Sequence, residues 1–113
     1  MKYEIIEIGS NKLPLRFGFN ALRKYSIKTG ATMNDLNKLA SGKMTFNDAF
    51  TLIYCGIEDG HRAAKQKFEL SIDDVTDMFD GNMDCMEKAF DVLSKSMGAD
   101  TAGKGKAKKV KKN

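Results

Sequence analysis

Residues 13–30 read LPLRFGFNALRKYSIKTG, and the spacing of the apolar residues changes halfway along this stretch with no linker between the halves. In the first half every second residue is apolar, at Leu13, Leu15, Phe17 and Phe19. A period of two predicts a half-buried β-strand with these side chains on its inner face. Pro14 cannot donate to a β-ladder, so we expect the strand at the edge of a sheet.

The second half of the stretch predicts a helix. Asn20 is a favourable N-cap residue, and the apolar residues after it fit a short helix: Ala21, Leu22 and Tyr25. Gly30 is expected to end this helix in the left-handed conformation. Because strand and helix adjoin directly, the helix should fold back onto the strand.

The residues before this stretch complete a β-hairpin. Residues 2–8, KYEIIEI, are rich in β-branched and aromatic types, and residues 9–12 form a turn sequence. We therefore predict a hairpin over residues 2–19 with a four-residue loop. An isolated hairpin is marginally stable in water, so its Leu/Phe face should be covered by the helices that follow.

Two further helices are expected in the middle of the chain. The first begins near Thr32, ends at Gly42 and carries three apolar residues: Met33, Leu36 and Leu39. The second is capped by Thr45 and should be the central helix, since one face collects Phe46, Ala49, Phe50, Ile53 and Ile57. Residues 61–70 either prolong it or form a polar connector, and Gly60 favours a break.

Two more helices complete the pattern. Ser71 begins a short helix that carries Val75, Met78 and Phe79 and stops at Gly81-Asn82. The last helix has apolar residues at alternating spacings of three and four, and it ends at Gly98: Met83, Met86, Phe90, Leu93 and Met97.

The predicted fold class is therefore α+β, mainly α: an N-terminal β-hairpin followed by about five short helices over residues 20–97, packed around one core. Residues 1–98 should form a single domain. Residues 99–113 contain one large aliphatic side chain, Val110, and are expected to be a disordered tail. Six lysines make this tail basic: Lys104, Lys106, Lys108, Lys109, Lys111 and Lys112.

The net charge of +4 comes from this tail, because residues 1–98 contain thirteen basic and fourteen acidic side chains. Cys55 and Cys85 stand in apolar segments, without further ligands at metal-binding spacing, and are predicted to be reduced and buried. No segment approaches the roughly twenty apolar residues that span a membrane, so we expect a soluble, cytoplasmic protein.

No catalytic constellation appears, and we predict neither an enzyme nor a bound cofactor or metal. His61 stands beside Arg62 without a recognisable nucleophile motif and is interpreted as solvent-facing. Residues 80–84, DGNMD, imitate the start of a calcium loop, with Asp91 at the twelfth position. However, Cys85 replaces the glycine that the sharp turn of such a loop requires.

Methionines gather near the end of the chain. Methionine fills irregular cores and also lines surfaces that accept varied apolar partners, and both interpretations stay open. The best candidates for partner binding lie where two short helices meet across Gly81-Asn82: Met78, Phe79, Met83 and Met86. Phe90 and Leu93 are assigned to the core.

The stretch LPLRFGFNALRKYSIKTG resembles the amino-terminal signature of phage tail assembly chaperones from long-tailed phages: an alternating strand, a short helix with Ala-Leu, and Thr-Gly. SIDDVTDMFDG, residues 71–81, resembles their later short acidic helix. With the helix between them, the resemblance covers residues 13 to about 97.

The resemblance implies a non-enzymatic protein of the host bacterial cytoplasm that binds the tape-measure protein, helps to recruit tail-tube subunits and is absent from the mature virion. Self-association is compatible with this role. A tape-measure chain is a long helix-rich polymer whose apolar stripe would aggregate if left uncovered. An adaptable groove over that stripe would prevent this.

Two alternatives remain. The first is a small DNA- or RNA-associated accessory protein anchored by the lysine tail, and the second is a phage head-tail connector. The tail has no aromatic residues for base stacking, and no helix has a concentrated Arg/Lys face with base-reading side chains, so specific nucleic-acid binding is not expected.

Overall fold

The computed structural model describes residues 2–35, 38 and 43–96. Two antiparallel strands precede the helices, in the order β1 (Glu4–Ile8), β2 (Asn11–Leu15), α1 (Phe19–Thr29), a 3₁₀ turn (Met33–Asp35), α3 (Phe46–Ala63), α4 (Ile72–Met78) and α5 (Asp84–Ser96). The fold is α+β and mainly α, which confirms the predicted class.

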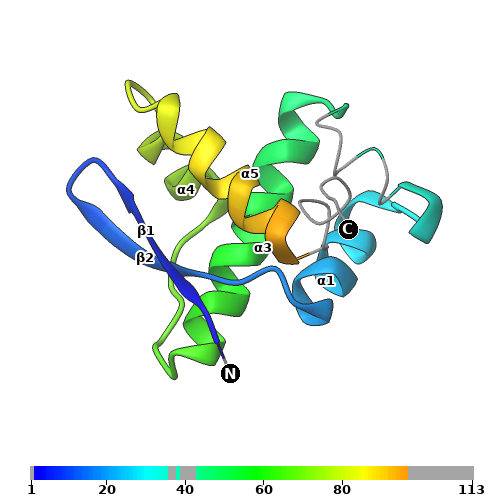
Figure 1. Ribbon diagram of the computed structural model, residues 1–113, viewed down its shortest axis with the longest axis horizontal. Helices are drawn as coiled ribbons and strands as arrows, with labels where there is room; N and C mark the ends of the chain where they lie inside the picture. Colours follow the sequence, from blue (N-terminus) through cyan, green and yellow to red (C-terminus); the bar gives the residue numbers. More distant parts are fainter. Residues whose placement is uncertain (1, 36–37, 39–42, 97–113) are drawn as a thin grey trace, which may run out of the picture.

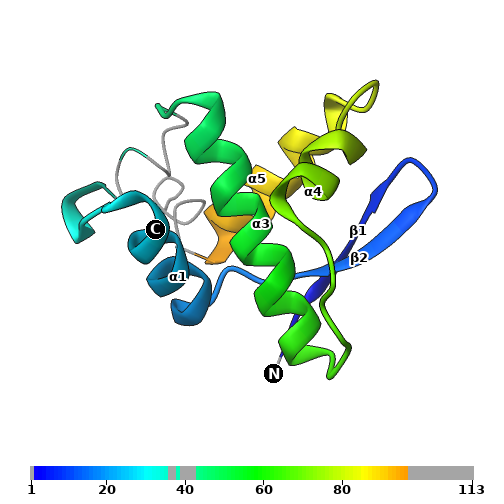
Figure 2. The same ribbon diagram turned by 180° about the vertical axis from the view of Figure 1, so that it is seen from behind.

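The long helix α3 is the central element. It packs against α1, β2 and α4, while α5 packs against β1. Figure 1 shows the hairpin and α5 in front of α3, and Figure 2 shows α1 and α4 on either side of it. The strands and all four of these helices contribute to one hydrophobic core, formed by Ile6, Ile8, Leu15, Phe17, Ala21, Tyr25, Leu52, Ile53, Cys55, Ile57, Val75, Phe79, Cys85, Ala89 and Leu93.

The hairpin turns over two residues, so the four-residue loop predicted for residues 9–12 is wrong. Asn11 already pairs with Ile8 in the ladder, and Gly9 has a φ of 62°, which is the conformation that the first position of a type II′ turn requires. Pro14 lies opposite Ile5, three residue pairs from the turn-closing pair. Hydrogen-bonded and non-bonded pairs alternate, so Pro14 falls where the ladder needs no N–H.

The strand also ends earlier than predicted, at Leu15 instead of Phe19. The N–H of Arg16 donates to the carbonyl of Gly56 in α3 at 3.0 Å, so the chain leaves the ladder there. Gly18 is the N-cap of α1, without a side-chain cap, and the prediction that Asn20 caps this helix is wrong. Asn20 lies inside α1, where its Oδ1 accepts a hydrogen bond from Nε of Arg23. The predicted end of the helix is confirmed by a φ of 77° at Gly30.

Helix α3 continues through Gly60 to Ala63, so the break favoured at Gly60 is wrong. A Cβ at Gly60 would overlap the carbonyl of Pro14, and one at Gly56 would overlap the ring of Phe17. Gly56 and Gly60 therefore form a glycine stripe on α3, where the absence of side chains lets the end of β2 and the joint to α1 pack closely. Thr45 caps the helix as predicted, accepting from the N–H of Asp48 at 3.1 Å.

The buried apolar face of α3 begins one turn later than predicted. Phe46 is the first residue of the helix and is 74% exposed, whereas Ala49, Ile53 and Ile57 are buried as expected. The C-terminal end of α3 is followed by a connector through Leu70, whose carbonyl accepts a hydrogen bond from the hydroxyl of Tyr54.

Helix α4 begins after Ser71, as predicted, and has a capping box: Ser71 Oγ accepts from the N–H of Asp74, and the Asp74 carboxylate accepts from the N–H of Ser71. Helix α5 begins at Asp84, and its buried stripe differs from the predicted one. That stripe consists of Cys85, Ala89 and Leu93, while Phe90 is half-buried.

Cys55 and Cys85 are buried and free, which confirms the prediction for both. None of the described helices is long and apolar enough to cross a membrane. The second predicted helix is represented by the 3₁₀ turn that begins at Met33, and its positions Leu36, Leu39 and Gly42 lie outside the described residues. The predicted boundary at Gly98 and the six tail lysines lie outside them too.

Candidate functional site

The four residues predicted to bind a partner lie together at the corner between α4 and α5, but they are not equally accessible. Phe79 is 1% exposed and belongs to the core, where its ring packs against that of Phe50 at 5.7 Å between centroids. Met78 and Met86 are half-buried against the core. Met83 is 63% exposed. The corner therefore presents one exposed methionine, and Phe79 is removed from the candidate site.

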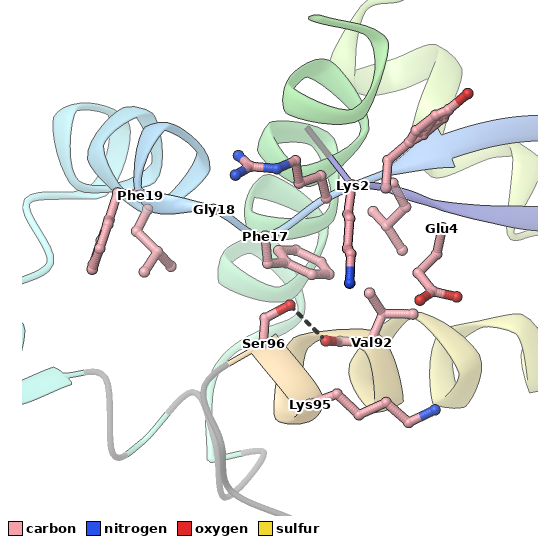
Figure 3. A pocket seen from close by; sticks show the side chains of 12 residues that line it. Lys2, Glu4, Phe17, Gly18, Phe19, Val92, Lys95 and Ser96 are labelled. Atoms are coloured by element: carbon pink, nitrogen blue, oxygen red, sulfur yellow. Dashed lines mark hydrogen bonds between the residues drawn. The ribbon is translucent and has the colours of Figure 1, made fainter. Parts of the chain in front are cut away.

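A cavity with an apolar surface lies elsewhere in the described residues, at the open end of the hairpin. It is a groove of about 660 Å³ between the start of β1, the joint between β2 and α1, and the last turn of α5 (Figure 3). Its apolar lining includes Phe17, Phe19, Leu22 and Val92. None of the four predicted contact residues lines it. Segments from both ends of the described chain thus form one apolar surface.

Phe19 is the most exposed large apolar side chain of the groove. It is 89% exposed, whereas Phe17, two residues earlier, is 5% exposed. In Figure 3 the ring of Phe17 lies under the hairpin and that of Phe19 extends from the start of α1, with Gly18 between them. The two rings thus lie on either side of the strand-to-helix joint, one in the core and one in solvent.

The joint is fixed by a buried carboxylate. Asp59 is 1% exposed, and its Oδ2 accepts hydrogen bonds from Nη1 of Arg16 at 2.9 Å and from the backbone N–H of Gly18 at 3.2 Å. Its Oδ1 accepts from Nη2 of Arg62 at 2.8 Å. Both oxygens are thereby satisfied, as a buried carboxylate requires. Asp59 holds the backbone at Gly18 against α3 and so sets where Phe17 and Phe19 lie.

Charged groups stand at the rim of the groove. Lys2 and Lys95 line it, together with the single carboxylate of Glu4. Figure 3 shows the ammonium group of Lys2 directed toward α5, with Lys95 along the opposite wall. Among the described residues neither lysine forms an ion pair. The groove is thus apolar in its centre, and two lysines against one carboxylate leave its edge with a net positive charge.

Helical periodicity contains a signal that would have identified Phe19 as an exposed residue. A helix that buries Ala21 and Tyr25 places residue 19 on its opposite side, because two residues correspond to about 200° of rotation. The expectation that Phe19 points inward came from extending the strand period past Leu15. The position at which the period changes therefore decides whether this phenylalanine is core or surface.

The interpretation of His61 as solvent-facing is wrong, since this side chain is 7% exposed. Its Nδ1 lies 2.8 Å from the carbonyl oxygen of Ile57, and its ring packs against Phe68 at 5.1 Å between centroids. A carbonyl oxygen can only accept, so Nδ1 carries the proton in this hydrogen bond. His61 is thus a packed residue of α3.

The segment that imitates a calcium loop has a different local role. The side-chain amide of Asn82 donates to the carbonyl of Met78 at 3.0 Å and so satisfies a carbonyl at the end of α4. Within residues 2–35, 38 and 43–96, no three His, Cys, Asp or Glu side chains form a group that could hold a metal ion.

Comparison with known proteins gives no relative: no protein-family model matches the chain, and no characterised protein or solved structure is significantly similar to it.

Proposed function

We propose that the protein is a non-enzymatic assembly chaperone of the kind found in long-tailed phages, which binds the tape-measure protein and helps to recruit tail-tube subunits around it. The resemblance of residues 13–30 and 71–81 to that family motivates the proposal. Its site of action would be the host bacterial cytoplasm, and the protein would be absent from the mature virion.

The observation that supports a binding role best is the exposure of Phe19 beside the apolar groove. A phenylalanine that is 89% exposed gains nothing from its position in the free protein, because burial of apolar surface is what stabilises such a side chain. An apolar helix laid across Phe19, Leu22 and Val92 would bury it. Helix-in-groove recognition uses this geometry, with apolar anchors spaced along one helix face.

The proposal is tested by co-expression with a tape-measure protein, chosen as the product of a long helix-rich reading frame adjacent to the gene for this chain. We expect the wild-type protein to keep the tape-measure protein soluble and to co-purify with it. Phe19→Ser should abolish co-purification without lowering the melting temperature, since the side chain is exposed.

A matched control is available on the same helix. Ile27 is 71% exposed and does not line the groove, so Ile27→Ser should leave co-purification unchanged. If Met83→Ser abolished binding while Phe19→Ser did not, the contact would lie at the corner between α4 and α5. Failure of the wild-type protein to bind any segment of the tape-measure protein would refute the proposed function.

A further inference from the structure

The groove at the open end of the hairpin combines an apolar centre with a positively charged rim. Phe17, Phe19 and Val92 provide apolar lining. The ammonium groups of Lys2 and Lys95 stand at the edge without an ion-pair partner in the described part of the chain. A ligand that fits both features must be apolar along one line and negatively charged beside it.

Arg16 also lines the groove, but its charge is already compensated. Its Nη1 donates to Asp59 at 2.9 Å, and the Asp59 side chain is fully buried. Glu4 is the one carboxylate of the lining. Against this single negative charge stand two lysines from opposite walls, one before β1 and one in the last turn of α5. The available positive charge therefore comes from Lys2 and Lys95.

We propose that this groove binds an amphipathic helix whose apolar stripe is flanked by Asp or Glu side chains. The apolar stripe would cover Phe19 and Val92, and the flanking carboxylates would pair with Lys2 and Lys95. A helix satisfies its own backbone hydrogen bonds, so it needs only apolar and charged side chains from the groove. The inference rests on the proposed function and specifies the chemistry of the segment that is bound.

The test uses the full-length protein and two synthetic peptides with the same leucine stripe, one flanked by glutamates and one by lysines. Peptide binding is followed by fluorescence anisotropy. At low salt we expect the glutamate-flanked peptide to bind about tenfold more tightly, because each exposed ion pair contributes modestly. The preference should shrink at high salt, where exposed charges are screened.

Variants separate the charge contribution from the apolar one. The double variant Lys2→Glu, Lys95→Glu should lose the preference for the glutamate-flanked peptide, and Phe19→Ser should weaken binding of both peptides. Lys12→Glu is the control, because Lys12 is exposed beside the hairpin turn and does not line the groove. It should retain the wild-type preference.

Three results would overturn the inference. The first is equal affinity for the two peptides, and the second is a preference that persists in the double lysine variant. The third is that the groove variants lose binding to a single-stranded oligothymidine but still bind both peptides as the wild type does. The second result would assign the preference to other lysines of the chain. The third would indicate a nucleic-acid ligand. The proposed function is judged separately, because tape-measure co-purification can survive in the double lysine variant if another surface makes the contact.

Discussion

Asp59 is the residue on which the strand-to-helix joint depends. Its buried carboxylate accepts hydrogen bonds from Arg16, Arg62 and the backbone of Gly18. We expect Asp59→Ala to lower the free energy of unfolding by about 3 kcal/mol, because it removes the buried acceptor that links Arg16, Arg62 and the backbone N–H of Gly18. Urea denaturation would measure the loss.

The neighbouring residue Glu58 supplies the control. Its carboxylate pairs with Lys24 at 3.1 Å, but both side chains are 29% exposed. Glu58→Ala should therefore cost less than about 1 kcal/mol. Equal losses in the two variants would mean that the carboxylate of Asp59 does not fix the joint.

The thiol of Cys55 makes the free energy of unfolding depend on pH in the alkaline range. Burial raises the pKa of its thiol from 9.0 to about 11, with nearby Glu58 acting in the same direction. Between these values the unfolded thiol loses its proton while the folded one keeps it, so the folded state is favoured below pH 9 and loses this advantage as the pH rises toward 11. The pKa values of Tyr25 and Tyr54 are also raised, mainly by burial, and reinforce the trend.

We expect the free energy of unfolding to fall by about 2 kcal/mol between about pH 8 and pH 10.5 through Cys55 alone. Cys55→Ala should show a shallower decline over this range, since the tyrosines remain. Denaturation curves at the two pH values for both proteins would check the prediction. An identical slope in the variant would exclude Cys55 as the titrating group.

Element boundaries show how far the sequence determines this fold. The capping residues Thr45 and Ser71 and the terminator Gly30 act on residues within one helical turn, and all three predictions are confirmed. Local signals succeed because their hydrogen bonds close within a few residues.

Contacts between distant residues explain the wrong predictions. The end of β2 depends on the carbonyl of Gly56, and the joint that follows is held by Asp59, which is 43 residues from Arg16. Gly60 resembles a helix breaker in isolation, yet it lies within α3 where the backbone of Pro14 passes. The groove was missed for the same reason, since its walls come from opposite ends of the described chain.

The glycine stripe of α3 gives an element-scale prediction. Alanine favours a helix by about 1 kcal/mol over glycine, so helix propensity alone predicts that Gly60→Ala is stabilising. The crossing backbone of Pro14 predicts the reverse, a loss of about 2 kcal/mol, because a Cβ there would overlap the Pro14 carbonyl.

Gly56→Ala provides the comparison, since its added methyl would meet the side chain of Phe17 and not a backbone atom. A side chain can adjust, so the loss of stability should be smaller than at Gly60. Thermal denaturation of both variants would measure the two losses. An increase in melting temperature for Gly60→Ala would contradict the close contact between the backbone of Pro14 and α3.

At the scale of the whole molecule, the described residues form a core that extends into α5. Among the described residues, Leu93 of α5 is the last buried member of this core. We therefore expect deletion of residues 99–113 to leave the melting temperature within a few degrees of the full-length value. A drop of many degrees in a thermal denaturation experiment would show that the tail contributes to packing.

The groove joins residues from the beginning and the end of the described chain, and this has a consequence for the order of synthesis. Lys2 and the joint around Gly18 leave the ribosome early, whereas Val92, Lys95 and Ser96 leave it after α5 has been made. A partly translated chain contains the aromatic wall but not the helix that faces it. A ligand that needs both walls could therefore be captured only after α5 has been made, so such a binding surface would form later than the hairpin and the strand-to-helix joint.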